Sequence, residues 1–154
     1  MSVDEKSSHF TKAAPGPFGP PLIGALLRIP WEAVRRRMLE RLHERGFGDL
    51  DGPHLSAFLF PGPQGLKPSE LAVRLRASKQ SVNHLLGQLE RFGYLGRRDD
   101  PDDLRARRIH LTRRGKAAVL VIREAVAEIE RDWARRLGSK RMALLRDLLR
   151  ELSE

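Results

Sequence analysis

Cysteine is absent from this 154-residue sequence. Its absence excludes disulfide bonds, zinc sites built on thiolates and switches that work by oxidation of a thiol. The five histidines, which remain free to converge in the folded chain, lack the spacings of zinc motifs such as H-x-x-x-H. The sequence therefore predicts no metal and no other cofactor.

Long apolar runs are also absent. No stretch approaches the roughly 18 to 20 apolar residues that a membrane-spanning helix needs. Residues 1–12, which include Asp4 and Glu5, lack the apolar core of a secretion signal. We therefore expect a cytoplasmic protein without a membrane partner.

Aromatic residues make up only 6% of the chain, whereas basic residues are abundant. There are 29 Lys and Arg against 20 Asp and Glu, which gives a net charge of +9. Such a charge favours a polyanionic partner but does not choose among DNA, RNA and an anionic membrane. Few rings are available to stack RNA bases. No phosphate loop or nucleophile elbow is present, so we expect no enzyme.

Two adjacent helices are predicted in the middle of the chain. The first covers residues 68–75, with Leu71 and Leu75 on one face and Lys67 as a poor residue at the N-cap position. The second begins after Ser78, a good N-cap, and ends at Gly93. Its apolar stripe must pack on the rest of the domain and consists of Val82, Leu85, Leu86, Leu89 and Phe92.

The opposite face of the second helix carries polar side chains that suit base edges and phosphates. An ordinary solvated helix face is the alternative interpretation. The candidate residues on this helix are Ser78, Lys79, Gln80, Ser81, Asn83, His84 and Gln88.

A basic hairpin is predicted directly after these helices. Residues 94–98 and 107–111 form its strands, and residues 99–106 form a polar tip. Arginine side chains suit a narrow minor groove, and we expect Asp103 to pair with Arg105 and stiffen the tip. A calcium site is disfavoured because the aspartate spacing is wrong. The arginines of the hairpin are Arg97, Arg98, Arg105, Arg107 and Arg108.

The segment resembles the MarR family of bacterial transcriptional regulators. The motifs that carry the resemblance are Ser69-Glu-Leu-Ala, Ser78-Lys-Gln-Ser-Val, Leu89-Glu-Arg-Phe-Gly-Tyr-Leu, Asp99-Asp-Pro-Asp-Asp-Leu-Arg and Leu111-Thr-Arg-Arg-Gly. The resemblance implies a homodimeric repressor or activator that binds a pseudo-palindromic operator in the bacterial cytoplasm and answers to small aromatic ligands. It places the wing arginine at Arg105 and its acidic partner at Asp103. The sequence departs from the family pattern at Lys67, Gly87 and Leu104.

The flanking segments suggest how the chain dimerises. Residues 22–45 form an amphipathic helix, which Pro30 is expected to interrupt, with Leu26, Trp31, Val34, Met38 and Leu42 buried. Apolar stripes follow on two C-terminal helices separated at Gly138-Ser139: Val119, Ile122, Val126, Ile129, Trp133 and Leu137, then Met142, Leu145, Leu149 and Leu152. Packing within the chain accounts for part of the first stripe, and we expect a dimer partner to cover the rest.

An effector ligand is predicted only through the resemblance, which places it between the dimer helices and the DNA-binding core. Alternatively, the aromatic candidates belong to the core and the others are solvated. The candidate residues are Trp31, Arg35, His43, His54 and Phe58.

The sequence therefore predicts a mainly α fold with a small β-hairpin wing. Residues 1–21 form a flexible arm, residues 51–112 a winged helix-turn-helix DNA-binding domain, and residues 22–50 with 113–154 a helical dimerisation region. The predicted function is a MarR-type regulator of duplex DNA. The alternative is a basic nucleic-acid-binding structural protein without a ligand response.

Overall fold

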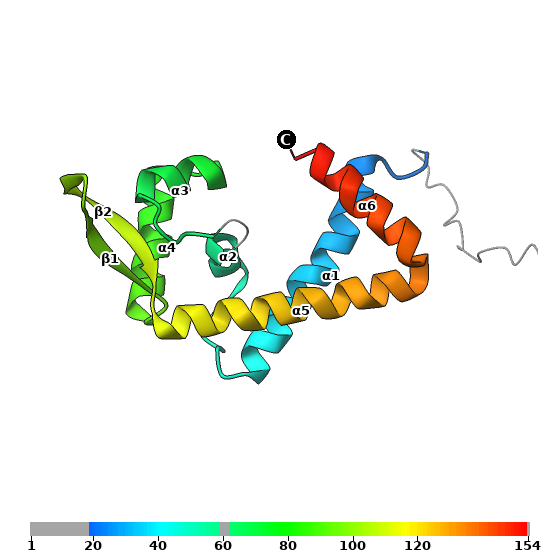
Figure 1. Cartoon of the computed structure of the whole chain (residues 1–154), viewed down its shortest axis with the longest axis horizontal. Coiled ribbons are helices and arrows are strands. Elements are labelled where there is room, and N and C mark those ends of the chain that lie inside the picture. Colours follow the sequence, from blue (N-terminus) through cyan, green and yellow to red (C-terminus); the bar gives the residue numbers. More distant parts are fainter. Residues whose placement is uncertain (1–18, 59–61, 154) are drawn as a thin grey trace, which may run out of the picture. The chain divides into compact units, whose positions relative to one another are not determined.

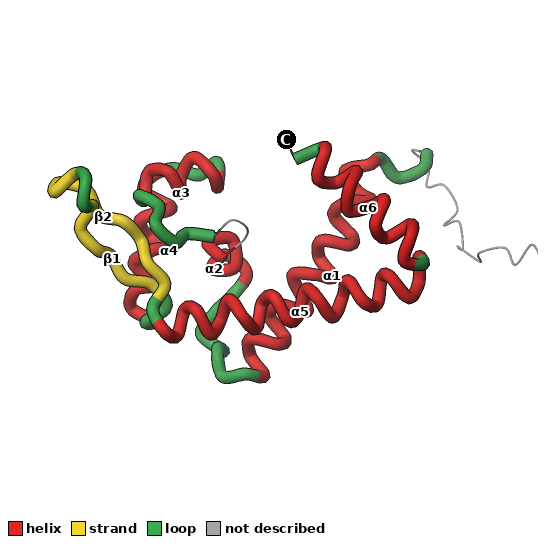
Figure 2. Tube along the Cα trace, in the orientation of Figure 1, coloured by secondary structure: helices red, strands yellow, loops and turns green. Residues whose placement is uncertain are grey.

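The computed structural model describes residues 19–58 and 62–153. Six α-helices and one two-stranded antiparallel sheet are present in this part of the chain (Figure 1, Figure 2). Their order is α1 (Ile23–Glu44), α2 (Gly52–Leu55), the 3₁₀ turn η1 (Ser56–Phe58), α3 (Pro68–Leu75), α4 (Lys79–Arg91), β1 (Leu95–Asp100), β2 (Asp103–Leu111), α5 (Arg113–Leu137) and α6 (Ser139–Glu151). None of these helices is both long and apolar enough to cross a bilayer. The predicted mainly α fold with a hairpin wing is confirmed.

The chain divides into two units, with the boundary after Glu32. Of the first unit the structure describes residues 19–32, so most of the predicted N-terminal arm lies outside the described residues. Pro30 lies inside α1 without interrupting it, contrary to the sequence prediction. Leu26 and Trp31 were predicted to be buried, but they are 49% and 42% exposed.

Local signals explain where α3 and α4 begin and end. The Lys67 side chain makes no hydrogen bond that caps α3. The Glu70 carboxylate, however, accepts a hydrogen bond of 2.7 Å from the Lys67 backbone N–H. The helix ends at Arg76, which has a left-handed backbone with φ +49°. Ser78 caps α4 as predicted, because its hydroxyl accepts from the Ser81 backbone N–H at 3.1 Å.

The wing is longer and its turn tighter than the sequence predicted. The expected tip of residues 99–106 is wrong for residues 99–100, which belong to β1, and for residues 103–106, which belong to β2. The strands pair from Leu95 with Leu111 outward, a bulge follows Asp99, and only Pro101 and Asp102 form the turn. Residues 104–106, which include Arg105, have no partner in this register and lie opposite the bulge.

The core of the second unit lies between α4, the base of the wing, the end of α1 and the start of α5. The predicted stripe of α4 is confirmed, since Val82, Leu86 and Leu89 are fully buried and Leu85 and Phe92 partly so. The largest fully buried side chains are Tyr94, Met38, Leu42, Leu50, Leu86, Leu89 and Ile109.

The joint between the wing and α5 explains the motif Leu-Thr-x-x-Gly. The Thr112 hydroxyl accepts a hydrogen bond of 3.0 Å from the Gly115 N–H, which caps α5. A Cβ at Gly115 would lie 2.1 Å from the Tyr94 carbonyl oxygen, so only glycine fits there. Gly87 in α4 has no atom within 4 Å of its absent Cβ, so its lack of a side chain serves no close packing.

Tyr94 ties this joint to the loop after α1. Its hydroxyl donates to Asp49, and the Arg114 guanidinium lies 3.1 Å from the hydroxyl and 4.7 Å above the ring centre. Burial, followed by the hydrogen bond to Asp49, raises the pKa of Tyr94 to about 12. The tyrosine therefore stays neutral at physiological pH.

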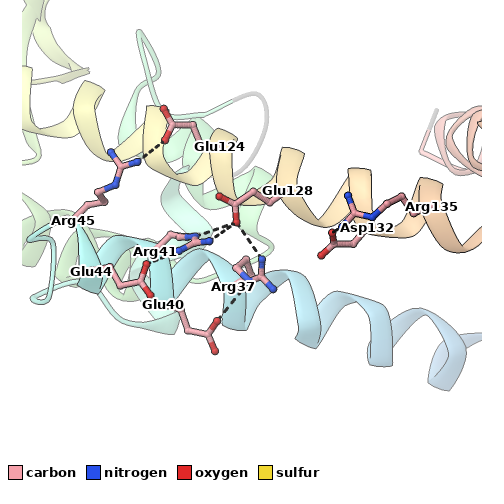
Figure 3. Close-up of polar contacts among 9 residues, drawn as sticks. All are labelled: Arg37, Glu40, Arg41, Glu44, Arg45, Glu124, Glu128, Asp132 and Arg135. Atoms are coloured by element: carbon pink, nitrogen blue, oxygen red, sulfur yellow. Dashed lines mark hydrogen bonds and ion pairs between the residues drawn. The ribbon is translucent and has the colours of Figure 1, made fainter.

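Ion pairs join the second half of α1 to α5 (Figure 3). Glu128 accepts from Arg37 at 3.1 Å and from Arg41 at 2.9 Å, and Arg45 lies 3.3 Å from Glu124. Hydrogen bonds from Arg41 and Arg37 lower the pKa of Glu128. Charge pairing, in addition to apolar packing, therefore holds α5 beside α1.

The two C-terminal helices separate where the sequence predicted. Gly138 has φ +82° and ends α5. Ile122 and Ile129 of the predicted stripe are buried, whereas Trp133 and Leu137 are half-buried. In α6 only Met142 is buried, and Leu144, Leu148 and Leu149 are exposed by 39% to 58%. Leu152, directly after the helix, is 78% exposed.

Candidate nucleic-acid interface

The outward face of α4 carries most of the polar residues predicted to bind DNA. Lys79, Gln80, Ser81, Asn83 and His84 are all exposed, and Gln88 is half-buried. These side chains offer both donors and acceptors along one side of the helix. Ser78 differs, because its hydroxyl already caps the helix and lies 2.8 Å from the Ser81 hydroxyl.

A groove lies between the start of α3, the start of α4 and strand β2. It has a volume of about 280 Å³ and brings together candidates from the helix and from the wing. No acidic side chain lines it. The lining residues are Lys67, Pro68, Ser69, Lys79, Asn83, Ala106 and Arg107.

The five wing arginines fall into two groups. Arg98 and Arg105 are exposed, and no ion pair involves either guanidinium within the part of the chain that the structure describes. Arg97 pairs with Glu90 of α4, and Arg107 lies 3.6 Å from Asp99 across the hairpin. Three of the five arginines, including Arg108, thus have partners inside the protein.

Arg108 contacts Asp100, a residue that was not predicted to have a functional role. Asp100 was placed in the polar tip, but its side chain is fully buried. One oxygen, Oδ2, lies 3.0 Å from Arg108 and 3.1 Å from Lys67, and the other accepts from the Asp102 N–H at 3.1 Å. These contacts, led by Arg108, lower the pKa of Asp100 to about 2.

Arg108 also donates to the Gly65 carbonyl oxygen at 2.9 Å. These donors therefore hold the wing together, and direct contact of Arg108 with DNA stays a prediction. A signal for Asp100 was present in the sequence. Aspartate followed by proline commonly begins a turn and accepts from the backbone two residues on, which Asp100 does here.

The expected pairing of Asp103 with the Arg105 guanidinium is wrong. The Asp103 carboxylate instead accepts from the backbone N–H of Arg105 at 3.1 Å, and it lies 3.7 Å from Lys67. The carboxylate therefore shapes the backbone of the wing and leaves the Arg105 side chain exposed. Direct contact of Asp103 with DNA stays a prediction.

The candidate ligand residues have mixed environments. Phe58 and His54 are buried at 6% and 4% exposure, and His54 stacks edge-on with Phe92 at 5.6 Å between ring centres. His43 is exposed and bonds the Leu50 carbonyl at 2.9 Å. Arg35 lies against Gly52, and Trp31 belongs to the other unit. The ligand site stays a prediction. Among the described residues, no three potential metal ligands lie together.

Comparisons with known proteins agree on a class of regulator. No protein-family model matches the chain. The chain spans about half the length of the curated relatives it matches. One is a putative transcriptional regulatory protein for the hcr operon of Thauera aromatica, 33% identical over 88 residues, or 57% of this chain and 53% of the relative.

Three solved structures share the fold. The transcriptional regulator Tm0710 from Thermotoga maritima is 31% identical with a TM-score of 0.56, over 83% of this chain and 89% of that one. MarR itself is 25% identical with a TM-score of 0.69, over 86% and 96%. CouR, a transcriptional repressor solved with a 23-mer DNA duplex, is 22% identical with a TM-score of 0.66, over 86% and 93%.

Identity over most of one regulator's length and the shared winged fold place the chain among transcriptional regulators. The motifs in residues 69–115 lie on the two helices and the wing that this fold requires. The chain therefore belongs to the MarR family of winged helix-turn-helix transcriptional regulators.

Proposed function

We propose that this regulator binds pseudo-palindromic duplex DNA as a homodimer, with α4 in the major groove and the wing in the flanking minor groove. The observation that carries the proposal is the exposed polar face of α4 beside a wing in which Arg98 and Arg105 have no ion-pair partner among the residues that the structure describes. An α-helix fits the major groove, where the four base pairs present distinct patterns. DNA bound to CouR, which has the same fold, supports the choice of partner.

The roles of the candidate residues differ. Gln80 and Asn83 carry amides that pair with adenine, and Lys79 suits guanine or a phosphate. Arg105 and Arg98 are exposed cations at the wing, and narrow minor grooves attract such cations. The remaining exposed candidates, Ser81, His84 and Arg107, are assigned to the DNA backbone or to neighbouring bases.

Exposed apolar surface supports the dimer. Leu148 of α6 and Leu152 directly after it are 47% and 78% exposed, and in the other unit Leu22 and Ile23 are 81% and 69% exposed. Apolar clusters of this kind mark interaction sites in soluble proteins. A symmetric dimer would present its two reading helices to half-sites about one helical turn apart. The predicted domain division, with α5 and α6 in the dimerisation region, belongs to this proposal.

A small aromatic effector would release the DNA only by binding one dimer state more tightly than the other. This part of the proposal rests on the family. The alternative, a basic structural protein without ligand response, predicts no preference among duplex sequences.

An electrophoretic shift separates these functions. The full chain is titrated onto the duplex that flanks its own gene, a random duplex and single-stranded RNA, each over a range of salt concentrations. A specific site should be bound most tightly and should lose less affinity with salt than the random duplex. Equal binding to all three nucleic acids would contradict the regulator, and a stable monomer in sedimentation at micromolar concentration would contradict the dimer.

A further inference from the structure

Residues 64–67 run along strand β2 and contact it at successive points. The Gln64 side-chain oxygen accepts from the Leu111 N–H at 2.7 Å. Ile109 exchanges two backbone hydrogen bonds of 2.8 Å, one with Gly65 and one with Leu66. The segment before α3 therefore acts as a partial third strand at the base of the wing.

Lys67 extends this row of contacts toward the tip of the wing. Its ammonium nitrogen lies 3.1 Å from the buried Asp100 carboxylate and 3.7 Å from Asp103. The side chain is 31% exposed and the Asp100 side chain is fully buried. Lysine cannot accept a hydrogen bond and therefore cannot cap α3, a task that Glu70 performs in part. Its ammonium group instead forms an ion pair with the Asp100 carboxylate.

We propose that Lys67 is a positioning residue that ties the tip of the wing to the start of α3 and so fixes the direction of the wing beside α4. The effect on DNA rests on the proposed function, whereas the tie itself does not. A two-stranded hairpin is marginally stable by itself, so contacts near its tip decide how rigidly it stands. Because Asp100 is buried, its charge requires partners, and Lys67, directly before α3, supplies one of them.

A direct contact of Lys67 with a DNA phosphate is the competing role. Lys67 lines the same groove as Lys79, which is exposed and has no ion pair among the described residues. Lys79→Met is therefore a matched control: it removes the same charge from the same groove and leaves Asp100 untouched. Lys67→Met keeps Arg108 on Asp100, so the core of the domain retains a paired carboxylate.

Hydrogen–deuterium exchange of the free protein tests the tie without DNA. In Lys67→Met, amides of residues 99–106 should exchange about three- to tenfold faster, while amides of α5 keep their rates. Lys67→Arg should restore slow exchange because arginine can also donate to Asp100. Unchanged exchange in Lys67→Met, or equal acceleration in Lys79→Met, would overturn the proposal.

Hydroxyl-radical footprinting then tests the consequence for DNA. Lys67→Met should lose protection of the flanking minor groove and keep protection of the central major groove. Lys79→Met should weaken binding to every sequence and keep both protections. If Lys67→Met behaves like Lys79→Met, Lys67 is a phosphate contact and the positioning role is wrong. If the wild-type chain protects no duplex, the proposed function fails, and the exchange experiment still decides the tie.

Discussion

The outward face of α4 and the wing are both rich in polar side chains, but they use them differently. On α4 the candidate side chains from Lys79 to His84 are exposed and mostly lack partners among the described residues. In the wing, Arg97, Arg107 and Arg108 pair with acidic groups of the protein. A charge in the wing is therefore not by itself a DNA contact. Arg98 and Arg105 form no such pair within the described residues, Arg107 is exposed although it pairs with Asp99, and Arg97 and Arg108 support the shape of the wing.

We expect the largest effect, on the free energy of unfolding, from alanine substitution of a glycine beside the wing. A glycine in α4 serves for comparison. Gly115→Ala should destabilise the protein by about 1 to 3 kcal/mol or more, because the new Cβ meets the Tyr94 carbonyl oxygen at 2.1 Å. Gly87→Ala is the control and should stabilise α4 by about 0.5 to 1 kcal/mol, since nothing lies within 4 Å. Urea unfolding measures both free energies, and a neutral Gly115→Ala would show that the joint is not tight.

Substitutions on α4 should act on particular base pairs. Asn83→Ala or Gln80→Ala should cost about 1 to 3 kcal/mol of binding free energy at the contacted pair and relax the preference there. Binding to a panel of single-base operator variants measures the loss. If each substitution weakens binding to every operator variant equally, α4 does not read the bases. Its exposed polar face would then not differ in role from the wing.

Removal of an unpaired wing arginine should weaken binding without regard to operator sequence. Arg105→Ala should lower affinity for all duplexes and reduce the slope of log affinity against log salt by about 1. Arg97→Ala, which removes a partner of Glu90, should change that slope less. Fluorescence anisotropy at several salt concentrations measures the slope for each variant. Equal slopes for the two variants would remove the distinction between paired and unpaired arginines.

Acid should destabilise the wing through the buried carboxylate of Asp100, whereas the exposed candidates of α4 include no carboxylate. The pKa of Asp100 is lowered from 3.8 to about 2 in the folded chain, so its charge stabilises the fold fully above the ordinary value. That contribution is lost as the pH falls through the folded pKa. Asp100→Asn should therefore be less stable than wild type at pH 7 and lose less stability between pH 4 and 2. Thermal unfolding across this range measures the difference, and parallel curves would show that Asp100 carries no pH dependence.

Much of the fold was predictable because its signals are local. Ser78 and Gly93 mark the ends of α4, and the apolar stripe from Val82 to Phe92 places its buried face. The wing was predicted in outline, but its turn was placed too widely, since the pairing of Asp100 with Asp103 depends on the approach of two separate strands. The continuity of α1 through Pro30 was missed for a similar reason, because proline only disfavours a helix interior and does not forbid it.

The candidate site also has some features that follow from local sequence and others that follow from tertiary contacts. By itself, the sequence determined the family motifs and the polar face of α4, since each depends on residues near one another in the chain. Only the tertiary structure decided which charges are engaged. Lys67, Arg108 and Asp100 come from separate elements, and they meet because burial of the Asp100 carboxylate requires partners. Lys67, a poor cap by sequence, thereby becomes the link between α3 and the wing.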